Sequence, residues 1–136
     1  MKLKYILESI SETYSFQKNQ EVVFLNTGDI LSGKILHSNY SNSNYLPGQA
    51  KKKIKNNDIL FSEIRPANQR YALVKLDKPE DYVVSTKLMV LRVFNKNYLV
   101  EYVYDFLTQP NTLFELQKLA ESRSGTFPQI TFSEIE

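Results

Sequence analysis

The sequence has 136 residues, of which 42% are hydrophobic and 24% charged, and its formal net charge is +2. This length predicts a single globular domain over residues 1–136, and the sequence has no run of about 18 apolar residues that would indicate a membrane span. The lack of cysteine excludes disulfides and thiolate metal sites, and a lone histidine, His37, excludes a histidine metal cluster within one chain. The basic start leads directly into Glu8 and Glu12 instead of an apolar segment, so we expect a cytoplasmic protein without a secretory signal.

The first half of the chain predicts one helix and two strands, separated by polar turns. Leu3, Ile6, Leu7 and Ile10 have the spacing of a short amphipathic helix. A β-rich run over 21–25 predicts a strand, the Asn26–Asp29 stretch a turn, and Ile30–Leu31 a second short strand. Residues 37–44 are almost entirely polar, so we expect a loop there.

The second half predicts four strands followed by two helices. The strands are expected at residues 59–61, 71–76, 83–84 and 88–94, with a turn at 78–81. One apolar helical face runs from Tyr98 to Leu107, and Pro110 ends that helix. Thr112 and Glu115 have capping-box spacing for a second helix ending near Ser122, with Gly125 just beyond it. The predicted fold class is therefore α+β, with a mixed or mainly antiparallel sheet and packed helices.

The order of several segments resembles the target-recognition domain of the specificity (S) subunit of type I restriction–modification systems. The segments that carry the resemblance cover nearly the whole chain: 25–31, 57–66, 83–86, 98–107 and 125–130. The resemblance implies a non-catalytic, cofactor-free module that recognises one half of a bipartite DNA target and directs methyltransferase and restriction subunits to it. In the family a long conserved helix follows such a domain, whereas this sequence ends at Glu136, so we expect a domain without that spacer helix.

If the resemblance holds, base reading is expected from the loop between the second and third predicted strands. Asparagine can bond adenine through two hydrogen bonds, and tyrosine can pack on sugar or base. The candidate residues are Lys34, His37, Asn39, Tyr40, Asn42, Asn44 and Tyr45. The alternative is a solvated loop whose Asn and Ser side chains only satisfy turns.

Phosphate contacts are expected from cationic clusters, each of which also has a structural interpretation. Lys51, Lys52, Lys53 and Lys55 form the densest cluster, or else a lysine-rich loop that keeps the protein in solution. Arg65 precedes a proline, which predicts an extended backbone from which it could reach a groove together with Asn68 and Arg70; alternatively it pairs with Glu63. The turn with Arg123, Ser124 and Thr126 could present amides to a phosphate, or simply cap the preceding helix.

Other functions have weaker support in the sequence. Asp29, Asp58 and Glu63 could form a metal-dependent nuclease cluster, but no nuclease signature with a suitably spaced lysine accompanies them. His37 lacks an identifiable nucleophile partner for general-base catalysis. The nine tyrosines could line a carbohydrate or protein groove. A non-enzymatic protein-interaction module is the stronger alternative.

Overall fold

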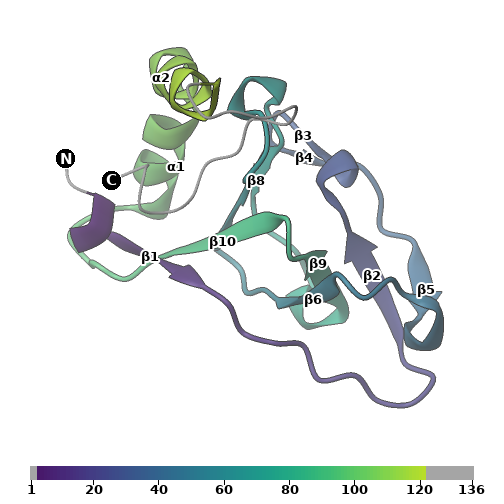
Figure 1. Cartoon of the computed structure of the whole chain (residues 1–136). Coiled ribbons are helices and arrows are strands. Elements are labelled where there is room, and N and C mark those ends of the chain that lie inside the picture. Colours follow the sequence, from purple (N-terminus) through teal and green to yellow (C-terminus); the bar gives the residue numbers. More distant parts are fainter. Residues whose placement is uncertain (1–2, 122–136) are drawn as a thin grey trace.

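Ten strands and two α-helices make up the described part of the chain, residues 3–121 of a computed structural model (Figure 1). The strands are β1 Leu7–Ile10, β2 Glu21–Leu25, β3 Ile30–Leu31, β4 Lys34–Ile35, β5 Tyr40–Asn42, β6 Ala50–Lys53, β7 Ile59–Ser62, β8 Tyr71–Leu73, β9 Tyr82–Ser85 and β10 Leu88–Val93. The helices are α1 Val100–Thr108 and α2 Pro110–Glu121. Short 3-10 turns occur at η1 Leu3–Tyr5, η2 Thr27–Asp29, η3 Ser43–Tyr45, η4 Pro66–Asn68 and η5 Pro79–Asp81.

The strands form two four-stranded sheets and one small hairpin. The first sheet has the order β1-β10-β7-β8 and is antiparallel throughout. The second has the order β5-β2-β9-β6, in which β2 and β9 are parallel and the other pairs antiparallel. The hairpin is β3-β4. The predicted α+β class with mainly antiparallel pairing is confirmed, but the strands are divided between sheets.

The central strands of the first sheet are buried on both faces. In β7, Ile59 and Phe61 pack toward the helices, whereas Leu60 packs in the core shared with the second sheet. In β10, Met89 and Leu91 face the helices in the same way. Successive side chains of a strand point to opposite faces, so a strand covered on both sides needs a continuous apolar run. That run made both strands predictable from sequence.

Both helices cover the outer face of the first sheet, as expected (Figure 1). Val103 and Leu107 of α1, with Leu113 and Leu116 of α2, are buried against that face. Pro110 separates the two helices as predicted. However, α2 already begins at Pro110, so Thr112 lies within the first turn and the predicted capping box at Thr112 is wrong.

The predicted N-terminal helix is also wrong. Leu3 lies in the 3-10 turn η1, and the chain then continues as strand β1, in which Leu7 pairs with Val93 of β10. Helical spacing puts Leu7 and Ile10 on one side of a helix, but three residues along a strand they face opposite sides. Accordingly, Leu7 packs in the helix-side core and Ile10 in the core between the sheets. Pairing with β10 determined the local conformation.

Besides β1 and the two-residue β4, the prediction missed two strands whose residues are mostly polar. β5 lies inside the predicted polar loop and pairs with β2. β6 contains three consecutive lysines and pairs with β9 through an irregular register between Ala50 and Lys52. Both are edge strands, and edge strands commonly carry polar or charged residues. An apolar alternation signal therefore cannot find them.

The β3-β4 hairpin is held against the first sheet and α1 by its tip. Gly33 has a φ of 90°, and its amide donates to the Tyr71 carbonyl oxygen at 2.9 Å. A Cβ atom at this position would lie 3.0 Å from the Tyr104 hydroxyl oxygen. Both the backbone angle and the close approach therefore require glycine.

No helix within residues 3–121 has the combination of length and apolar character needed to cross a bilayer.

Candidate nucleic-acid interface

Residues 37–45, which we call the recognition loop after their predicted role, contain β5 and η3 and are ordered further by side-chain hydrogen bonds. The Asn42 side chain caps η3 by accepting a hydrogen bond from the Asn44 amide at 2.9 Å. The Asn44 side chain donates to Oδ1 of Asn19, which ties the loop to the β1–β2 connection. The Asn39 amide donates to Nδ1 of His37 at 3.0 Å. These contacts fix the backbone and leave the Asn39 side chain exposed.

His37 and Tyr40 connect the recognition loop to neighbouring turns. Nε2 of His37 lies 3.5 Å from the Asp29 carboxylate. The Tyr40 hydroxyl donates to Oδ2 of Asp81 at 2.6 Å, and this hydrogen bond raises the pKa of Tyr40 to about 12. Tyr45, by contrast, is 86% exposed. The loop therefore combines anchored side chains with exposed ones that could meet a ligand.

The lysines of β6 do not form one cationic patch. Lys51 is exposed, but Nζ of Lys52 donates to the Leu88 carbonyl oxygen at 2.8 Å, and burial lowers its pKa. Nζ of Lys53 lies 3.4 Å from the Glu12 carboxylate. Lys55 lies beyond the strand; it lines one hollow together with Lys53 and another together with Arg92. These lysines are close together in the sequence, but Lys52 and Lys53 are engaged in contacts within the protein. They therefore present less free positive charge than the sequence predicted.

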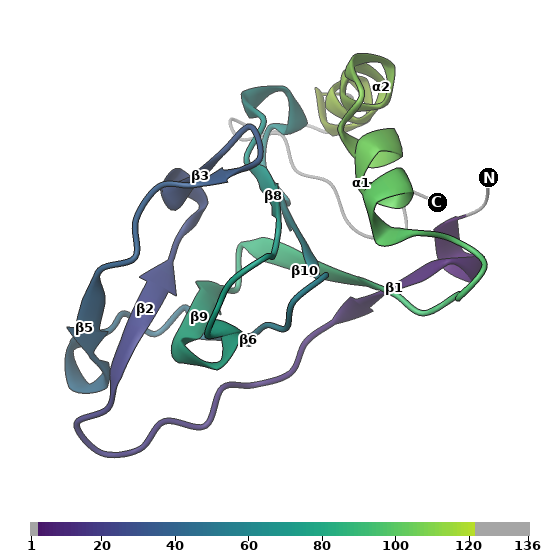
Figure 2. The same cartoon turned by 180° about the vertical axis from the view of Figure 1, so that it is seen from behind.

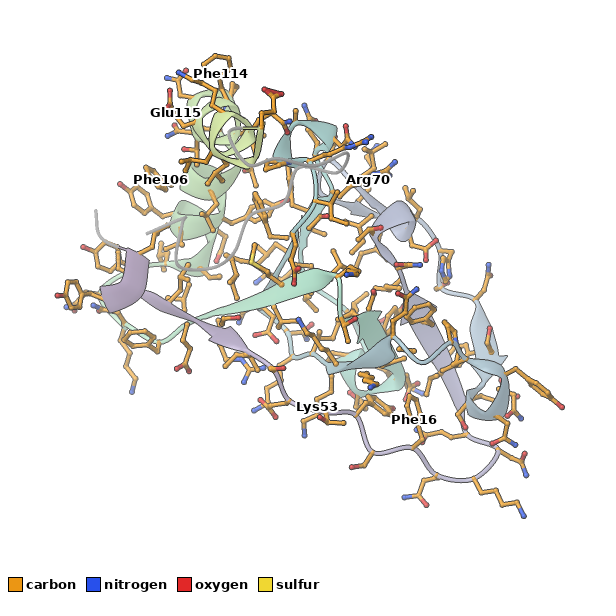
Figure 3. The ribbon with its side chains drawn as sticks, in the orientation of Figure 1. Phe16, Lys53, Arg70, Phe106, Phe114 and Glu115 are labelled. Carbon is orange, nitrogen blue, oxygen red and sulfur yellow. The ribbon has the colours of Figure 1, made fainter. Side chains whose placement is uncertain are left out.

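The remaining predicted cations lie on the side of the molecule near η4 and the hairpin. Lys34 is exposed on β4, and Asn68 is exposed in η4. Nη1 of Arg70 donates to the Ile30 carbonyl oxygen at 3.1 Å and so holds the hairpin to β8 (Figure 3). Arg65 has a φ of 48°, so the extended backbone predicted for a residue before proline is wrong. Arg123, Ser124 and Thr126 lie outside the described residues.

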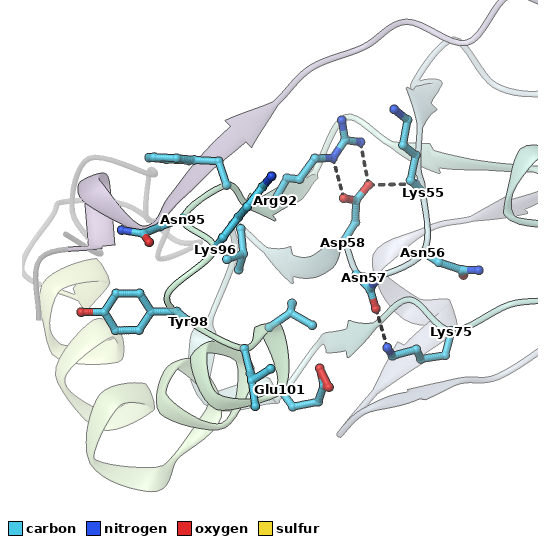
Figure 4. A pocket seen from close by; sticks show the side chains of 14 residues that line it. Lys55, Asn56, Asn57, Asp58, Lys75, Arg92, Asn95, Lys96, Tyr98 and Glu101 are labelled. Atoms are coloured by element: carbon cyan, nitrogen blue, oxygen red, sulfur yellow. Dashed lines mark hydrogen bonds and ion pairs between the residues drawn. The ribbon is translucent and has the colours of Figure 1, made fainter.

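Arg92 forms a charge cluster that no sequence pattern predicted. Its Nε and Nη2 donate to the two oxygens of Asp58 at 2.7 and 2.9 Å (Figure 4). Its Nη1 donates to Glu12 at 2.8 Å. Asp58 is almost fully buried and also accepts from the Lys55 amide at 2.8 Å. These contacts hold the pKa of Arg92 above its usual value and lower that of Glu12. Asp58 is thus a structural ion-pair partner.

A metal-dependent nuclease site has no support in the described part of the chain. Asp29 caps η2 by accepting from the Asn26 amide, and Asp58 is occupied by Arg92. Among residues 3–121, no group of three or more His, Cys, Asp or Glu side chains is placed to hold a metal ion.

The Arg92 cluster forms part of the wall of a hollow of about 560 Å³ (Figure 4). We call it the basic cleft. Its cationic lining residues are Lys55, Lys75, Arg92 and Lys96, and its acidic ones are Asp58 and Glu101. These residues come from the turn before β7, the segment after β8, the end of β10 and the start of α1. Only Lys55 belongs to the predicted phosphate contacts.

Comparison with known proteins identifies the class. The family model described as type I restriction modification DNA specificity domain matches residues 1–136. The chain belongs to this family, which confirms the resemblance seen in the sequence.

Individual relatives agree with this assignment. The chain is 49% identical over 130 residues to the type I restriction enzyme HindI specificity subunit of Haemophilus influenzae, covering 96% of this chain and 28% of that protein. It therefore spans less than a third of the length of this relative.

Two solved structures share the fold. One chain, from a study of complex assembly and conformational transition of the type I R-M system, matches with a TM-score of 0.72 at 22% identity. The HsdS subunit from Thermoanaerobacter tengcongensis matches with a TM-score of 0.71 at 23% identity. Each match covers 87% of this chain and 30% of the other chain.

Proposed function

We propose that this chain recognises a specific DNA sequence, one half of a bipartite target, for a type I restriction–modification complex. It has no catalytic role of its own and directs methyltransferase and restriction subunits to the target. The observation that carries the proposal is the match of the entire chain to a DNA specificity domain. The described structure adds an exposed polar loop whose backbone is already fixed, and a cleft lined by an excess of cations.

Base reading is assigned to the exposed side chains of the recognition loop. Asn39, Asn44 and Tyr45 are exposed and have the groups that read base edges or pack on them. His37, Tyr40 and Asn42 have protein partners and shape the loop, and Asn44 would exchange its hydrogen bond to Asn19 for one to a base. Tertiary anchoring of this kind limits the conformational entropy lost on binding.

Duplex binding to the purified chain tests the proposal. A selection from randomised duplexes should enrich one short sequence, and wild type should bind it more tightly than a scrambled duplex at the same salt concentration. Asn39→Ala should reduce this discrimination by about 1–3 kcal/mol if its amide contacts a base. Lys118→Ala, an exposed substitution in α2, serves as the control and should leave discrimination unchanged. Enrichment of no sequence would refute the proposed function.

Protein interaction is a second candidate function, supported by the exposed apolar side chains of the helix pair. Leu99 is 74% exposed, Phe114 62% and Tyr102 55%, and Phe114 projects from α2 away from the sheet (Figure 3). This surface could contact partner subunits while the loop binds DNA. Phe114→Glu should then weaken association with the methyltransferase subunit in a pull-down and leave duplex affinity unchanged. An unchanged pull-down would exclude this part of α2 from the contact.

A further inference from the structure

Within residues 3–121, three lysines of the basic cleft have no carboxylate as an ion-pair partner. Arg92 is bonded to Asp58 and Glu12, so it contributes little free positive charge. Lys55 and Lys96 have no ion-pair partner within residues 3–121, and Nζ of Lys75 donates to the neutral side chain of Asn57 (Figure 4).

The asparagines of the basic cleft serve to shape it. The Asn56 side chain bonds both the amide and the carbonyl oxygen of Leu76, at 2.8 and 2.9 Å. Asn95 donates to the Tyr5 carbonyl oxygen and accepts from the Asn97 amide. The turn carrying Lys55, the segment carrying Lys75 and the loop carrying Lys96 are therefore each held in place. The ligand suited to such fixed, separated positive charges is a chain of negative charges.

A second hollow lies beside the recognition loop and shares one lining residue with the basic cleft. It has a volume of about 410 Å³, and its polar lining residues are Ser38, Tyr40, Lys75, Asp77, Lys78 and Tyr82. Lys75 lines both hollows. Figure 2 shows the segment that follows β8 running between β10 on one side and β2 and β5 on the other. A polyanion bound along Lys96, Lys55 and Lys75 would thus be led toward the recognition loop.

We propose that Lys55, Lys75 and Lys96 contact backbone phosphates of the DNA strand whose bases the recognition loop reads. This inference rests on the proposed function and assigns the phosphate contacts to the basic cleft instead of the lysine row of β6. Lys52 bonds the Leu88 carbonyl oxygen and Lys53 pairs with Glu12, so binding a phosphate would require each to give up an existing contact. Lys51 is the one exposed lysine of that row without such a contact, whereas Lys55 and Lys96 have no ion-pair partner within residues 3–121 and Lys75 would give up only its hydrogen bond to Asn57.

A salt titration distinguishes the two lysine groups. Each phosphate contact contributes about 0.9 to the slope of log affinity against log salt concentration, so Lys55→Ala/Lys75→Ala/Lys96→Ala should reduce that slope by up to about 3. The loss of affinity should be the same for the selected and scrambled duplexes, because phosphates carry no sequence information. Lys18→Ala/Lys87→Ala/Lys118→Ala removes the same charge from exposed sites elsewhere and should leave the slope near that of wild type.

The possible outcomes separate this inference from the proposed function. Sequence preference with an unchanged slope in the cleft variant would overturn the inference but leave the function standing. A reduced slope in the cleft variant, without any sequence preference in wild type, would support phosphate contacts by Lys55, Lys75 and Lys96 and refute the proposed function. No duplex binding by wild type at low salt would refute both. Displacement of duplex by a polyglutamate peptide at equal charge concentration would show a general site for acidic chains and overturn the DNA assignment.

Circular dichroism and urea unfolding establish that the cleft variant is folded. If the triple variant does not fold, the single variants Lys55→Gln, Lys75→Gln and Lys96→Gln provide the same test. Each should lower the slope by about 0.9. Three unchanged slopes would overturn the inference.

Discussion

The recognition loop and the basic cleft are held by contacts of different burial. In the loop, the amides of Asn39 and Asn44 bond side chains two residues away, and the longer-range hydrogen bonds from Tyr40 to Asp81 and from Asn44 to Asn19 join exposed side chains. In the cleft, Arg92 joins the buried Asp58 and the more exposed Glu12, which lie 34 and 80 residues away along the chain. Substitutions in the loop can therefore change its surface without disturbing the core, whereas the Arg92 cluster ties β10 to the segments next to β7 and β1 in the first sheet.

The largest expected loss of stability comes from breaking the Arg92 cluster in the wall of the basic cleft. Arg92→Leu leaves the buried Asp58 carboxylate without its cation, and losing one partner of a buried ion pair costs about 3–5 kcal/mol of folding free energy. Urea unfolding followed by circular dichroism measures the loss. Lys96→Ala, also in the cleft but exposed, should change stability by less than about 0.5 kcal/mol. If Arg92→Leu is as stable as wild type, the Arg92 cluster contributes no more to folding than the contacts of the recognition loop do.

A smaller loss is expected from the loop. Asn42→Ala removes the side-chain cap of η3 and should cost about 0.5–2 kcal/mol, near the lower end because the loop is partly solvated. Asn39→Ala removes an exposed side chain in the same loop and is the matched control. The same unfolding experiment compares the two. A cost for Asn42→Ala as large as that for Arg92→Leu would contradict the distinction drawn between loop and cleft.

A pH titration probes the exposed side of the Arg92 cluster. Hydrogen bonding to Arg92 lowers the pKa of Glu12, so this group adds stability above its unfolded-state pKa of about 4.3 and loses it as pH falls through the lower folded-state value. Glu12→Gln should therefore remove part of the stability loss seen between neutral and acidic pH. The unfolding free energy of both proteins across this range gives the result. Parallel pH profiles would mean that Glu12 contributes nothing to the cluster.

The smallest effect concerns the anchor of the loop at Tyr40. Its raised pKa, about 12, stabilises the fold up to the unfolded-state value near 10, and this contribution disappears as pH rises through about 12. Asp81→Asn removes the acceptor carboxylate and should return the pKa of Tyr40 toward 10. The difference in ultraviolet absorbance between each protein and its Tyr40→Phe counterpart isolates this phenol. An unshifted titration would show that Asp81 does not anchor the loop.

The sequence predicted best those elements whose residues are buried on both faces or strongly periodic. The apolar runs of β7 and β10 and the helical stripe of α1 carried clear signals because burial determines their composition. β6 gave no such signal, because three consecutive lysines, Lys51–Lys53, favour the interpretation as a solvent-exposed loop. The helix expected over residues 3–10 failed because pairing with β10 overrode a periodicity that two conformations can satisfy.

In the candidate site, features formed by residues close together in the sequence could be predicted, whereas features assembled from distant segments could not. The polar composition of residues 37–45 led directly to the prediction of a base-reading loop, which remains a prediction. The basic cleft combines Lys55, Lys75 and Lys96 from separate segments, and no spacing in the sequence shows that they line one hollow. Likewise, no pattern connects Arg92 to Asp58 before the pairing of β10 with β7 is known. Long-range strand pairing produced these features.

The pairing of β1 with β10 also has a consequence for biosynthesis. Leu7 emerges from the ribosome early, but its partner Val93 is translated much later, and β2 must similarly wait for β9. Contacts between residues so distant in sequence form slowly, and unpaired apolar strands are prone to aggregation in the interval. The nascent N-terminal segment cannot complete either sheet until residues 82–93 have been translated, so folding of both sheets is coupled to a late stage of synthesis.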